Sequence, residues 1–294
     1  MKVAIFGTNG QLGSDLVRTA AALGREVEVI PLTRPDIDAA APEQTEARLA
    51  DLAFDAAINC VAATRVDDCE TQPGPAVAAN AAFAGLVARQ CARKGARLLH
   101  VSTDYVFGGG PERTPISEDA PRAPVNVYGA TKALGEDLAR LDHHDTLVVR
   151  VAALFGVSGA SGKGGNFVES MIRFGRERGQ LRVVDDQRTV PTATADAARG
   201  LWALLAAQAP AGVYHLANGG EATWCEFARA IVEDAGVAAA VEPITSAEFP
   251  TPARRPAYTV LDTAKILTAT DWRPPHWRDA LGVYLREKGH APDR

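Results

Sequence analysis

The sequence predicts an α/β fold, namely a doubly wound, Rossmann-like parallel sheet with a smaller C-terminal substrate-binding region. The first observation is a short apolar run at residues 3–6 that leads directly into a glycine-rich turn. The second is the repeated alternation of short apolar runs with segments of helical periodicity, which is typical of a parallel sheet covered by helices on both faces. The third is a change after residue 155, where glycine- and serine-rich sequence interrupts this alternation.

The elements follow one another in the order that this fold requires. In the first half, buried strands are expected at residues 3–6, 27–30, 56–60, 97–102 and 146–151, with helices after Gly13, near 42–52, at 75–94 and from Tyr128 onward. In the second half, strands are expected at 181–184, 212–217 and 241–244, and helices at 166–178, 194–207, 223–235 and 277–287. The carboxyl ends of parallel strands meet at one edge of a sheet, where ligands bind.

The turn after the first apolar run carries Gly7, Gly10 and Gly13. Such a turn between a strand and a helix is typical of dinucleotide binding, because glycines let the backbone approach a pyrophosphate and the helix N-terminus offers free N–H groups. The spacing is one residue longer than Gly-x-Gly-x-x-Gly, and an ordinary glycine loop is the alternative. We therefore expect residues 1–155 to form a NAD(P)-binding Rossmann domain. Residues 156–294 are expected to be mainly a substrate-binding region, with some segments returning to the sheet.

Two further stretches bear on the cofactor. A NAD site usually has an acidic residue at the end of the second strand, but this chain has Arg34 nearby, which could pair with a 2′-phosphate. An ordinary exposed arginine explains Arg34 equally well. The small residues Ala62, Ala63 and Thr64 follow the third strand and would let the adenine-ribose half of a cofactor lie close to the backbone.

Tyr128 and Lys132 are the strongest candidates for chemistry. They are four residues apart in a helical segment, so their side chains share one face. An ammonium beside a phenol stabilises the phenolate and lowers the pKa of the tyrosine, which makes it a proton donor near neutral pH. The alternative is an ordinary exposed helix.

Polar residues also reach the carboxyl edge from the fourth strand. Thr103 and Asp104 carry a hydroxyl and a carboxylate to the rim that holds the Gly7 turn. Near the C-terminus, Arg254 and Arg255 form a basic pair beside prolines. A guanidinium suits a diphosphate, although a solvated pair is equally compatible with the sequence.

Composition limits the class of protein. The net charge of -5 argues against a nucleic-acid or anionic-membrane partner, and no apolar run approaches the length of a membrane span. Four cysteines without paired spacing, and a chain start without a signal peptide, predict a cytoplasmic protein. His143 and His144 have no partners at metal-ligand spacing, so we predict no metal.

The motifs together resemble the dTDP-4-dehydrorhamnose reductase family, a sugar-nucleotide reductase branch of the extended short-chain dehydrogenases/reductases. The resemblance spans nearly the whole chain in the right order, and its C-terminal motifs are specific to this branch. The main motifs are Gly7-Thr8-Asn9-Gly10-Gln11-Leu12-Gly13, Ser102-Thr103-Asp104-Tyr105-Val106-Phe107, Tyr128-Gly129-Ala130-Thr131-Lys132, Asn166-Phe167-Val168, Val184-Asp185-Asp186-Gln187 and Pro252-Ala253-Arg254-Arg255-Pro256.

The resemblance implies NADPH-dependent reduction, with NADH possible, of the 4-keto group of dTDP-4-dehydro-6-deoxy-L-mannose to give dTDP-L-rhamnose. Tyr128 would protonate the carbonyl oxygen, Lys132 would hold the nicotinamide ribose, and Thr103 would bind the ketone. Asp104, Asn166 and Arg255 are the further substrate candidates. The cofactor would be lined by Gly7, Asn9, Gly10, Gln11, Leu12, Arg34, Asp38, Ala62, Ala63 and Thr64, together with Tyr128 and Lys132. The expected partner is the sugar nucleotide, and the chain is expected to be a monomer or homodimer.

Some positions depart from the family pattern on the substrate side. Ala153 stands where the family has a tryptophan beside the sugar, and Arg188 and Tyr258 also differ. The acidic residues that hold magnesium in some relatives are absent around residues 192–195, which again predicts no metal. The alternatives are a reductase of another 4-keto-6-deoxy sugar nucleotide, and a non-catalytic NADP-binding subunit that regulates a partner enzyme. A dehydratase would have Glu after the Thr103-Asp104 pair, where this chain has Tyr105.

Overall fold

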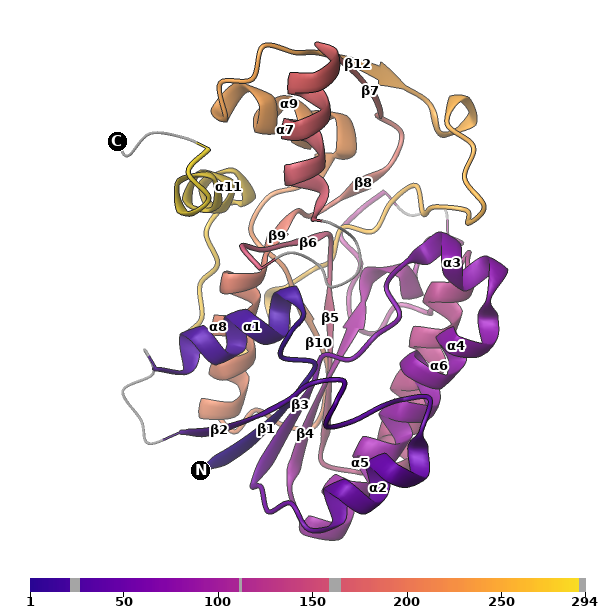
Figure 1. The fold of residues 1–294 in the computed structure, drawn as a ribbon, viewed down its shortest axis with the longest axis vertical. Helices are drawn as coiled ribbons and strands as arrows, with labels where there is room; N and C mark the ends of the chain where they lie inside the picture. The colour runs from indigo at the N-terminus through magenta and orange to yellow at the C-terminus, as the bar shows by residue number, and fades with distance from the viewer. Residues whose placement is uncertain (22–26, 111–112, 159–164, 291–294) are drawn as a thin grey trace.

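The computed structural model of the chain describes residues 1–21, 27–110, 113–158 and 165–290. Its centre is a parallel sheet whose described strands lie in the order β10-β5-β4-β3-β1-β2 (Figure 1). This order, with the first strand inside the sheet and helices on both faces, confirms the predicted doubly wound fold. The strands are β1 (Lys2–Phe6), β2 (Glu28–Leu32), β3 (Ala56–Asn59), β4 (Arg97–Thr103), β5 (Thr146–Val151) and β10 (Gly212–Leu216).

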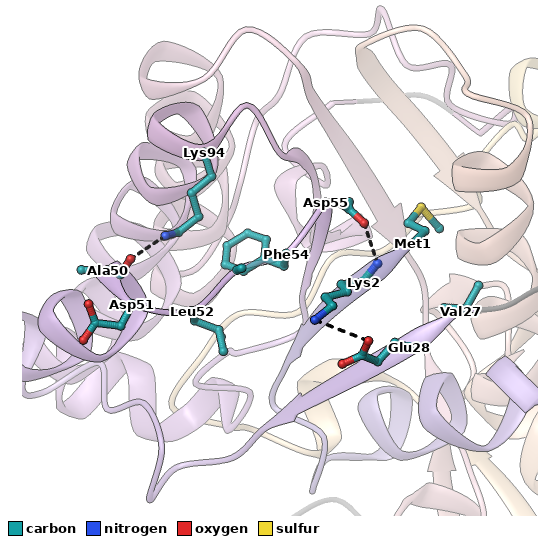
Figure 2. A pocket seen from close by; sticks show the side chains of 11 residues that line it. Met1, Lys2, Val27, Glu28, Ala50, Asp51, Leu52, Phe54, Asp55 and Lys94 are labelled. Atoms are coloured by element: carbon teal, nitrogen blue, oxygen red, sulfur yellow. Dashed lines mark hydrogen bonds and ion pairs between the residues drawn. The ribbon is translucent and has the colours of Figure 1, made fainter.

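A hollow of about 900 Å³ lies at the amino ends of β1 and β2 (Figure 2). Its polar side chains pair with one another: the Lys2 ammonium lies 3.6 Å from the Glu28 carboxylate, and the Lys2 backbone N–H donates to Asp55. Ligands of parallel α/β sheets bind at the opposite, carboxyl edge. The active site is therefore expected at the carboxyl edge of the sheet, away from this hollow.

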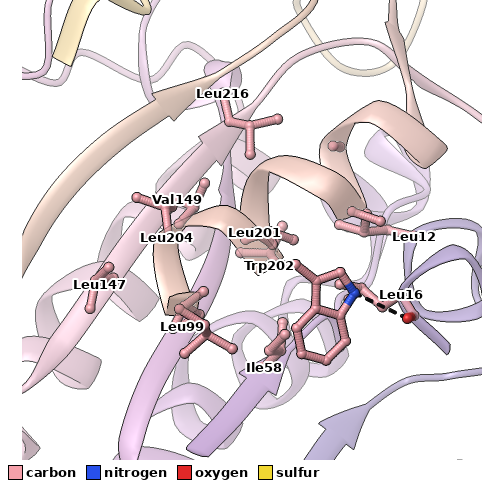
Figure 3. Packing of buried hydrophobic residues seen from close by; sticks show 14 of the residues in the cluster. Leu12, Leu16, Ile58, Leu99, Leu147, Val149, Leu201, Trp202, Leu204 and Leu216 are labelled. Carbon is pink, nitrogen blue, oxygen red and sulfur yellow. Dashed lines mark hydrogen bonds between the residues drawn. The ribbon is translucent and has the colours of Figure 1, made fainter. Parts of the chain in front are cut away.

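Helices cover the two faces of the sheet with separate cores. On one face lie α1 (Gln11–Ala20) and α8 (Thr194–Ala206), and on the other α2 (Pro42–Ala50), α5 (Phe83–Lys94) and α6 (Val127–Asp142). The largest fully buried side chain of the first core is Trp202, which is 1% exposed (Figure 3). Its indole N–H donates to the Leu16 carbonyl oxygen at 3.2 Å, so the polar atom of this buried ring is satisfied while α8 is fixed to α1.

A second lobe lies beyond the carboxyl edge of the sheet (Figure 1). It has its own core, which is rich in aromatic rings. The ring of Phe155 packs against those of Phe227 and Tyr284, with centroids 5.5 Å apart in each pair. Its elements are α7 (Phe167–Arg178), β7 (Gln180–Val184), α9 (Trp224–Asp234), β12 (Ala240–Ile244) and α11 (Trp277–Glu287), with β7 and β12 paired in parallel. Short strands join this lobe to the sheet edge: β6 (Leu154–Phe155) pairs with β9 (Thr192–Ala193), and β8 (Arg188–Thr189) with β11 (Ala222–Thr223).

The structure differs from the predicted elements in several places. The helix expected over residues 75–94 is formed by α4 (Pro73–Val77), a π-helical turn at Ala78–Ala82 and α5. Two short helices were not expected, α3 (Val66–Thr71) and α10 (Ala264–Ala269), because six residues give little periodicity to read. No helix in the described part of the chain combines the length and the apolar character that crossing a bilayer would need.

Candidate active site

The glycine turn has the geometry of a phosphate-binding loop. Gly7 has a φ of +85°, in the left-handed region that favours glycine, and a Cβ on Gly13 would lie 2.2 Å from the Gly7 carbonyl oxygen. The helix α1 can therefore approach the turn only with glycine at position 13. Gly10 is the N-cap residue and provides no side-chain cap, so the first N–H groups of α1 remain available to an anion. Asn9 is exposed beside this turn, whereas Leu12 packs into the core.

Gln11 connects the glycine turn to the second lobe. Its side-chain oxygen accepts a hydrogen bond from the Gly156 N–H at 2.9 Å. Asn166 donates to the Gly156 carbonyl oxygen at 2.9 Å and to the Tyr284 hydroxyl at 3.1 Å, and its own oxygen caps α7 by accepting from the Glu169 N–H. Both polar atoms of Asn166 are thus engaged within the protein. The structure places Asn166 beside the cofactor turn, and its contact with substrate stays a prediction.

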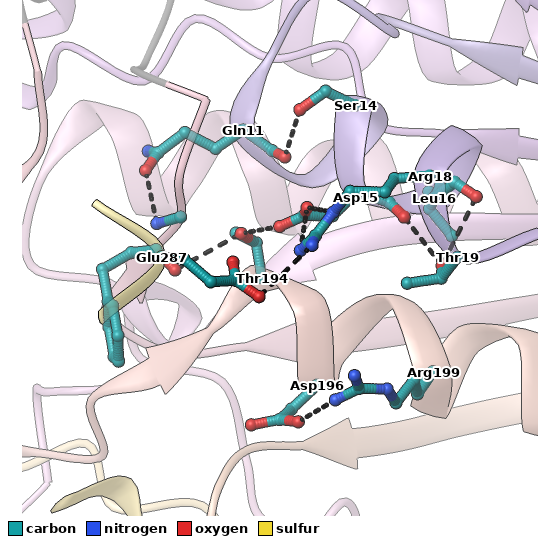
Figure 4. Close-up of polar contacts among 12 residues, drawn as sticks. Gln11, Ser14, Asp15, Leu16, Arg18, Thr19, Thr194, Asp196, Arg199 and Glu287 are labelled. Carbon is teal, nitrogen blue, oxygen red and sulfur yellow. Dashed lines mark hydrogen bonds and ion pairs between the residues drawn. The ribbon is translucent and has the colours of Figure 1, made fainter. Parts of the chain in front are cut away.

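Charged residues fill the seam between α1, α8 and α11 (Figure 4). The Arg18 guanidinium lies 2.8 Å from Asp15 and 3.4 Å from Glu287, and the Thr194 hydroxyl donates to the other Asp15 oxygen. A hollow of about 290 Å³ adjoins this seam beside Tyr284. The described residues contain no group of three acidic, histidine or cysteine side chains placed to hold a metal ion. The seam acids are instead balanced by arginine.

The residues predicted to contact the adenosine half of a cofactor lie beyond β2 and β3. Arg34 is exposed, in a turn fixed by Asp36, whose carboxylate accepts from the Thr33 N–H and hydroxyl at 2.9 Å. The structure gives Arg34 no ion pair with any residue that it describes. Asp38 is exposed and accepts a hydrogen bond from the Ala40 N–H. The guanidinium is therefore free to meet an anion at this rim.

Asn80, which the sequence interpretation missed, fixes the loop at 62–64. Its side-chain oxygen accepts from the Ala63 N–H at 2.7 Å, and its amide donates to the Thr131 hydroxyl at 3.0 Å. Asn80 is fully buried in the π-helical turn, a feature that often marks functional sites. The only sequence signal was a polar side chain within an alanine-rich apolar segment. One residue thus links the predicted cofactor loop to the helix that carries Tyr128 and Lys132.

Tyr128 and Lys132 lie at the start of α6, under the carboxyl edge. Asn126 caps the helix by accepting from the Gly129 N–H at 2.8 Å. A Cβ on Gly129 would lie 2.1 Å from the Tyr105 carbonyl oxygen, so only glycine lets α6 approach the end of β4 this closely. The Tyr128 ring packs edge-on against that of Tyr105 with centroids 5.7 Å apart. The Lys132 ammonium is 2% exposed and donates to the Val101 carbonyl oxygen at 2.6 Å.

The electrostatics of this pair correct one expectation. Burial raises the pKa of Tyr128, while a hydrogen bond with Thr103 acts in the opposite direction. The predicted lowering of the tyrosine pKa by Lys132 is wrong for this structure, because the ammonium is held by the strand carbonyl and burial dominates. Burial likewise lowers the pKa of Lys132 to about 8, with Glu136 acting in the opposite direction.

Glu136, one turn beyond Lys132, is the centre of a buried charged network that we call the Glu136 cluster. Arg150 of β5 binds both carboxylate oxygens, at 2.9 and 2.8 Å, and Arg122 lies 3.2 Å from one of them. The Ser102 hydroxyl donates to the same carboxylate, and His215 lies 3.3 Å from Arg150. Glu136 and Arg150 are nearly inaccessible to solvent. The network fixes α6 to β4, β5 and β10.

Asp104 is the centre of a different network, the Asp104 cluster. Its Oδ1 accepts from the Thr103 hydroxyl at 3.1 Å, and its Oδ2 accepts from Thr189 at 3.2 Å and Thr259 at 2.6 Å. Burial raises the pKa of Asp104 to about 6, although the hydroxyls of Thr259, Thr103 and Thr189 favour the ionised form. Both oxygens are engaged within the protein, so the predicted contact of Asp104 with the sugar stays a prediction.

Comparison with known proteins identifies the family. Residues 1–289 match the family described as the RmlD substrate binding domain. A dTDP-4-dehydrorhamnose reductase of Mycobacterium tuberculosis is 38% identical over 288 residues, covering 97% of this chain and 92% of the relative. The chain belongs to the dTDP-4-dehydrorhamnose reductase family.

Other relatives have different names. A spore coat polysaccharide biosynthesis protein of Bacillus subtilis is 38% identical over 99% of both chains. A probable dTDP-4,6-dihydroxy-2-methyloxan-3-one 4-ketoreductase of Streptomyces antibioticus is 38% identical, covering 100% of this chain and 99% of the relative.

Solved structures of the dTDP-4-dehydrorhamnose reductase family share the whole fold. The enzyme from Clostridium acetobutylicum is similar with a TM-score of 0.91 and 34% identity, covering 98% of this chain and 100% of the other. The enzyme from Bacillus anthracis, solved in complex with NADP, has a TM-score of 0.88 and 32% identity, covering 97% of this chain and 99% of the other. The resemblance predicted from the motifs is confirmed.

Two of the remaining positions bear on where a dTDP-4-dehydrorhamnose reductase would hold its substrate. One nitrogen of Arg255 pairs with Asp67 at 2.9 Å, while its Nη1 is buried without a hydrogen-bond partner among the described residues. A buried unpaired donor is costly, which fits a group that an anion completes. Ala153 has a φ of +38°, in the left-handed region, and lies between β5 and β6 beside Thr192, whose N–H donates to the Ala153 carbonyl oxygen.

Proposed function

We propose that the protein is an NADPH-dependent reductase that converts dTDP-4-dehydro-6-deoxy-L-mannose into dTDP-L-rhamnose, with NADH as a possible second cofactor. The observation that supports this proposal is the close packing of the start of α6, which carries Tyr128 and Lys132, against the end of β4, which carries Thr103, in a chain similar over nearly its whole length to enzymes named for this reaction. The four free cysteines fit a reducing, cytoplasmic location.

The chain's own residues supply the proton and the positioning. A bound nicotinamide would supply the hydride for the reduction at C4 of the sugar. The Tyr128 hydroxyl would give its proton to the carbonyl oxygen, so that ketone, hydride and proton become a secondary alcohol. Thr103 would bind the same oxygen, and Lys132, whose ammonium donates to the Val101 carbonyl oxygen of β4, would hold the nicotinamide ribose. The tyrosinate is then reprotonated from solvent.

Residues along the carboxyl edge of the sheet would hold the remaining parts of the cofactor and the sugar nucleotide. The N–H groups at the start of α1 and the residues Gly7 to Leu12 would hold the pyrophosphate of the cofactor, and Arg34 its 2′-phosphate. Ala62 to Thr64 and Asp38 would border its adenosine half. Residues 156–294 would mainly bind the sugar nucleotide, with Arg255 on its diphosphate because one of its nitrogens lacks a partner in the described structure.

A second candidate is the reduction of another 4-keto-6-deoxy sugar nucleotide. It is favoured by Ala153, which replaces an expected aromatic side chain with a methyl group and so leaves more space beside the sugar. The relative from Streptomyces antibioticus, named a 4-ketoreductase of a different dTDP-linked sugar, has the same 38% identity to this chain as the Mycobacterium tuberculosis reductase. The substrate choice is therefore the open part of the proposal.

The test follows the loss of NADPH absorbance with purified 4-keto-6-deoxy sugar nucleotides of both kinds. Tyr128→Phe should lower kcat by about two to four orders of magnitude, the usual weight of a positioned proton donor. The matched control is Tyr214→Phe in β10. It removes a phenol hydroxyl that donates to the Pro210 carbonyl oxygen, and it should leave turnover intact. Near-normal turnover of Tyr128→Phe would exclude Tyr128 as the donor. No turnover of any 4-keto sugar nucleotide by the wild-type protein would overturn the proposed function and favour a non-catalytic NADP-binding role.

A further inference from the structure

The short helix α3 lies directly after the loop at 62–64, and two of its side chains fix it in place. The thiol of Cys69, which is buried, donates to the Ala63 carbonyl oxygen of that loop at 3.6 Å. The carboxylate of Glu70 accepts from the Val127 N–H, at the start of α6, at 2.7 Å. The helix α3 is therefore held between the predicted cofactor loop and the helix that carries the proposed proton donor.

A third side chain of α3, Asp67, binds the segment 252–256 in the C-terminal half of the chain. Its Oδ1 accepts from the Ala253 N–H at 3.1 Å, and its Oδ2 accepts from the Arg255 Nη2 at 2.9 Å. Ala253 is fully buried, so the backbone bond lies inside the protein. One carboxylate thus holds the backbone of this segment and, two residues later, its guanidinium.

The same segment is also attached to the start of α6. Asn126, the N-cap residue of this helix, donates from its side-chain amide to the Arg254 carbonyl oxygen at 2.8 Å. Tyr128 follows two residues after Asn126. The segment 252–256 is therefore fixed beside the helix that carries Tyr128, and Asp67 and Asn126 hold it from two elements of the sheet domain.

The Arg255 guanidinium is only partly satisfied by these contacts. Its Nη1 is buried and has no hydrogen-bond partner among the residues that the structure describes. An arginine carries its N–H groups in one rigid plane, so a bond that fixes Nη2 also fixes the direction of Nη1. A buried donor without a partner is costly, and charged N–H groups in a fixed plane suit a phosphate oxygen. The pair with Asp67 therefore aligns a second nitrogen and leaves it unpaired.

We propose that Asp67 is a positioning residue that acts through Arg255 and orients its guanidinium for the diphosphate of the sugar nucleotide. This role rests on the proposed function, in which Arg255 binds that diphosphate. Asp67 itself need not touch the ligand, and it takes no part in the transfer of hydride or proton. Its contribution is therefore to the binding of the sugar nucleotide and not to the chemical step.

Two effects of the Asp67 carboxylate on an anionic ligand oppose each other. Its negative charge repels a diphosphate, but its side chain is 39% exposed, so solvent and salt screen that repulsion. Its bond to Arg255 removes rotamer freedom that the long side chain would otherwise lose when the ligand binds. The ordering effect should win, so loss of the carboxylate should weaken binding.

The test measures the Kd of the full-length protein for dTDP by isothermal titration calorimetry, together with the steady-state constants. Asp67→Asn keeps the size of the side chain but not its charge, and its single oxygen cannot accept from both Ala253 and Arg255. The Kd for dTDP and the KM for the 4-keto sugar nucleotide should each rise about ten-fold. The kcat and the KM for NADPH should stay unchanged, which is the mark of lost ground-state binding.

Two controls separate this role from a general disturbance of the fold. Asp68→Asn removes the same charge from the same helix, but Asp68 is exposed and lies 3.5 Å from the exposed Arg65, so this variant should behave like the wild type. Thymidine has the base and sugar of dTDP without its phosphates. Asp67→Asn should therefore bind thymidine as the wild type does.

A double-mutant cycle tests whether Asp67 acts through Arg255. Arg255→Met should raise the Kd for dTDP about thirty-fold, because it removes a charged donor. In that background Asp67→Asn should change the Kd by less than about two-fold, since there is no guanidinium left to orient. Arg255→Lys gives a reading even if Asp67→Asn fails to fold. A lysine has one nitrogen, which cannot occupy the positions of both Nη1 and Nη2, so it should bind dTDP about as weakly as Arg255→Met.

The outcomes distinguish the role of Asp67 from the proposed function. The role would be overturned by an Asp67→Asn variant that binds dTDP as well as the wild type or better, or that also loses thymidine. Additive losses of the two variants in the cycle, or wild-type affinity in Arg255→Lys, would overturn it too, and in each case the reductase activity would stand. A wild-type protein that neither binds dTDP nor turns over a 4-keto sugar nucleotide would instead overturn the proposed function itself.

Discussion

The two buried carboxylates near Tyr128 and Lys132, Glu136 and Asp104, have opposite surroundings. Glu136, on the sheet side of α6, is held by the guanidinium groups of Arg150 and Arg122. Asp104, at the carboxyl rim, receives three hydroxyl groups and no counter-ion in its cluster. The guanidinium groups pair with the Glu136 carboxylate within the protein and fix α6 to the sheet. A carboxylate held only by neutral donors can lose its charge at a working pH.

The same contrast applies to the arginines. Arg150 is 3% exposed and fully engaged with Glu136, whereas Arg34 is exposed and has no ion pair with any described residue. Charges that the protein balances itself lie beneath α6, and charges that it leaves unbalanced lie at the rim where ligands are proposed to bind. The following predictions test whether this division is real.

The largest effect is expected from breaking the balanced cluster. Arg150→Met should lower the free energy of unfolding by about 3–5 kcal/mol, because it leaves the Glu136 carboxylate buried without its main partner. Arg122→Met is the matched control. Because Arg122 is partly exposed, its replacement should lower the free energy of unfolding by no more than about 1 kcal/mol. Urea denaturation at pH 7 measures both. Equal losses in the two variants would show that Glu136 does not depend on its buried partner.

The second prediction concerns the unbalanced carboxylate and the pH dependence of stability. Because the folded pKa of Asp104 is raised from 3.8 to about 6, its stabilising contribution is fully present below the unfolded pKa and is lost as the pH rises through 6. The complete loss should be about 3 kcal/mol of unfolding free energy, at 1.36 kcal/mol per pKa unit. Asp104→Asn should lack this loss, so the stability difference between the two proteins should change by that amount between about pH 3 and pH 7.5. A constant difference would mean that Asp104 is ionised throughout.

A smaller effect is expected from the unbalanced arginine. Arg34→Ala should lower kcat/KM for NADPH by about ten-fold and leave kcat/KM for NADH unchanged, since only NADPH has a 2′-phosphate for the guanidinium to bind. The ratio of the two kcat/KM values measures this selectivity directly. An equal loss with both cofactors, or no loss, would show that Arg34 is an ordinary exposed residue.

The smallest effect concerns the shape of the rim. Ala153→Trp should raise the preference for the rhamnose precursor over other 4-keto-6-deoxy sugar nucleotides by about five-fold in kcat/KM, by adding an aromatic contact. The gain is limited because the left-handed backbone at φ +38° disfavours a bulky side chain. Strict rhamnose specificity in the wild type, combined with a variant that only loses activity, would exclude an open pocket at Ala153.

Local sequence predicted most of the helices and strands, and the placement of Tyr128 and Lys132 on one helix, because these signals are local. Strand, glycine turn and helix follow one another within residues 2–20, and Tyr128 and Lys132 share one helical turn. The Asp104 cluster could not be predicted, because Thr189 and Thr259 lie 85 and 155 residues away and no pattern marks a threonine as the partner of a distant carboxylate. The direction of the Tyr128 pKa was also missed, since it depends on burial in three dimensions and not on the spacing to Lys132.

The pairing of β10 with β5 has a consequence for how the protein is made. A ribosome that has released β1 to β5 leaves β5 as an open sheet edge until Gly212–Leu216 emerges to pair with it. The same delay leaves the α1 face of the sheet without Trp202 and the rest of α8. The nascent chain therefore passes through a stage with an unpaired edge and exposed apolar surface, the state in which chaperones bind and aggregation begins. Shortening the chain before residue 212 would make that transient stage permanent.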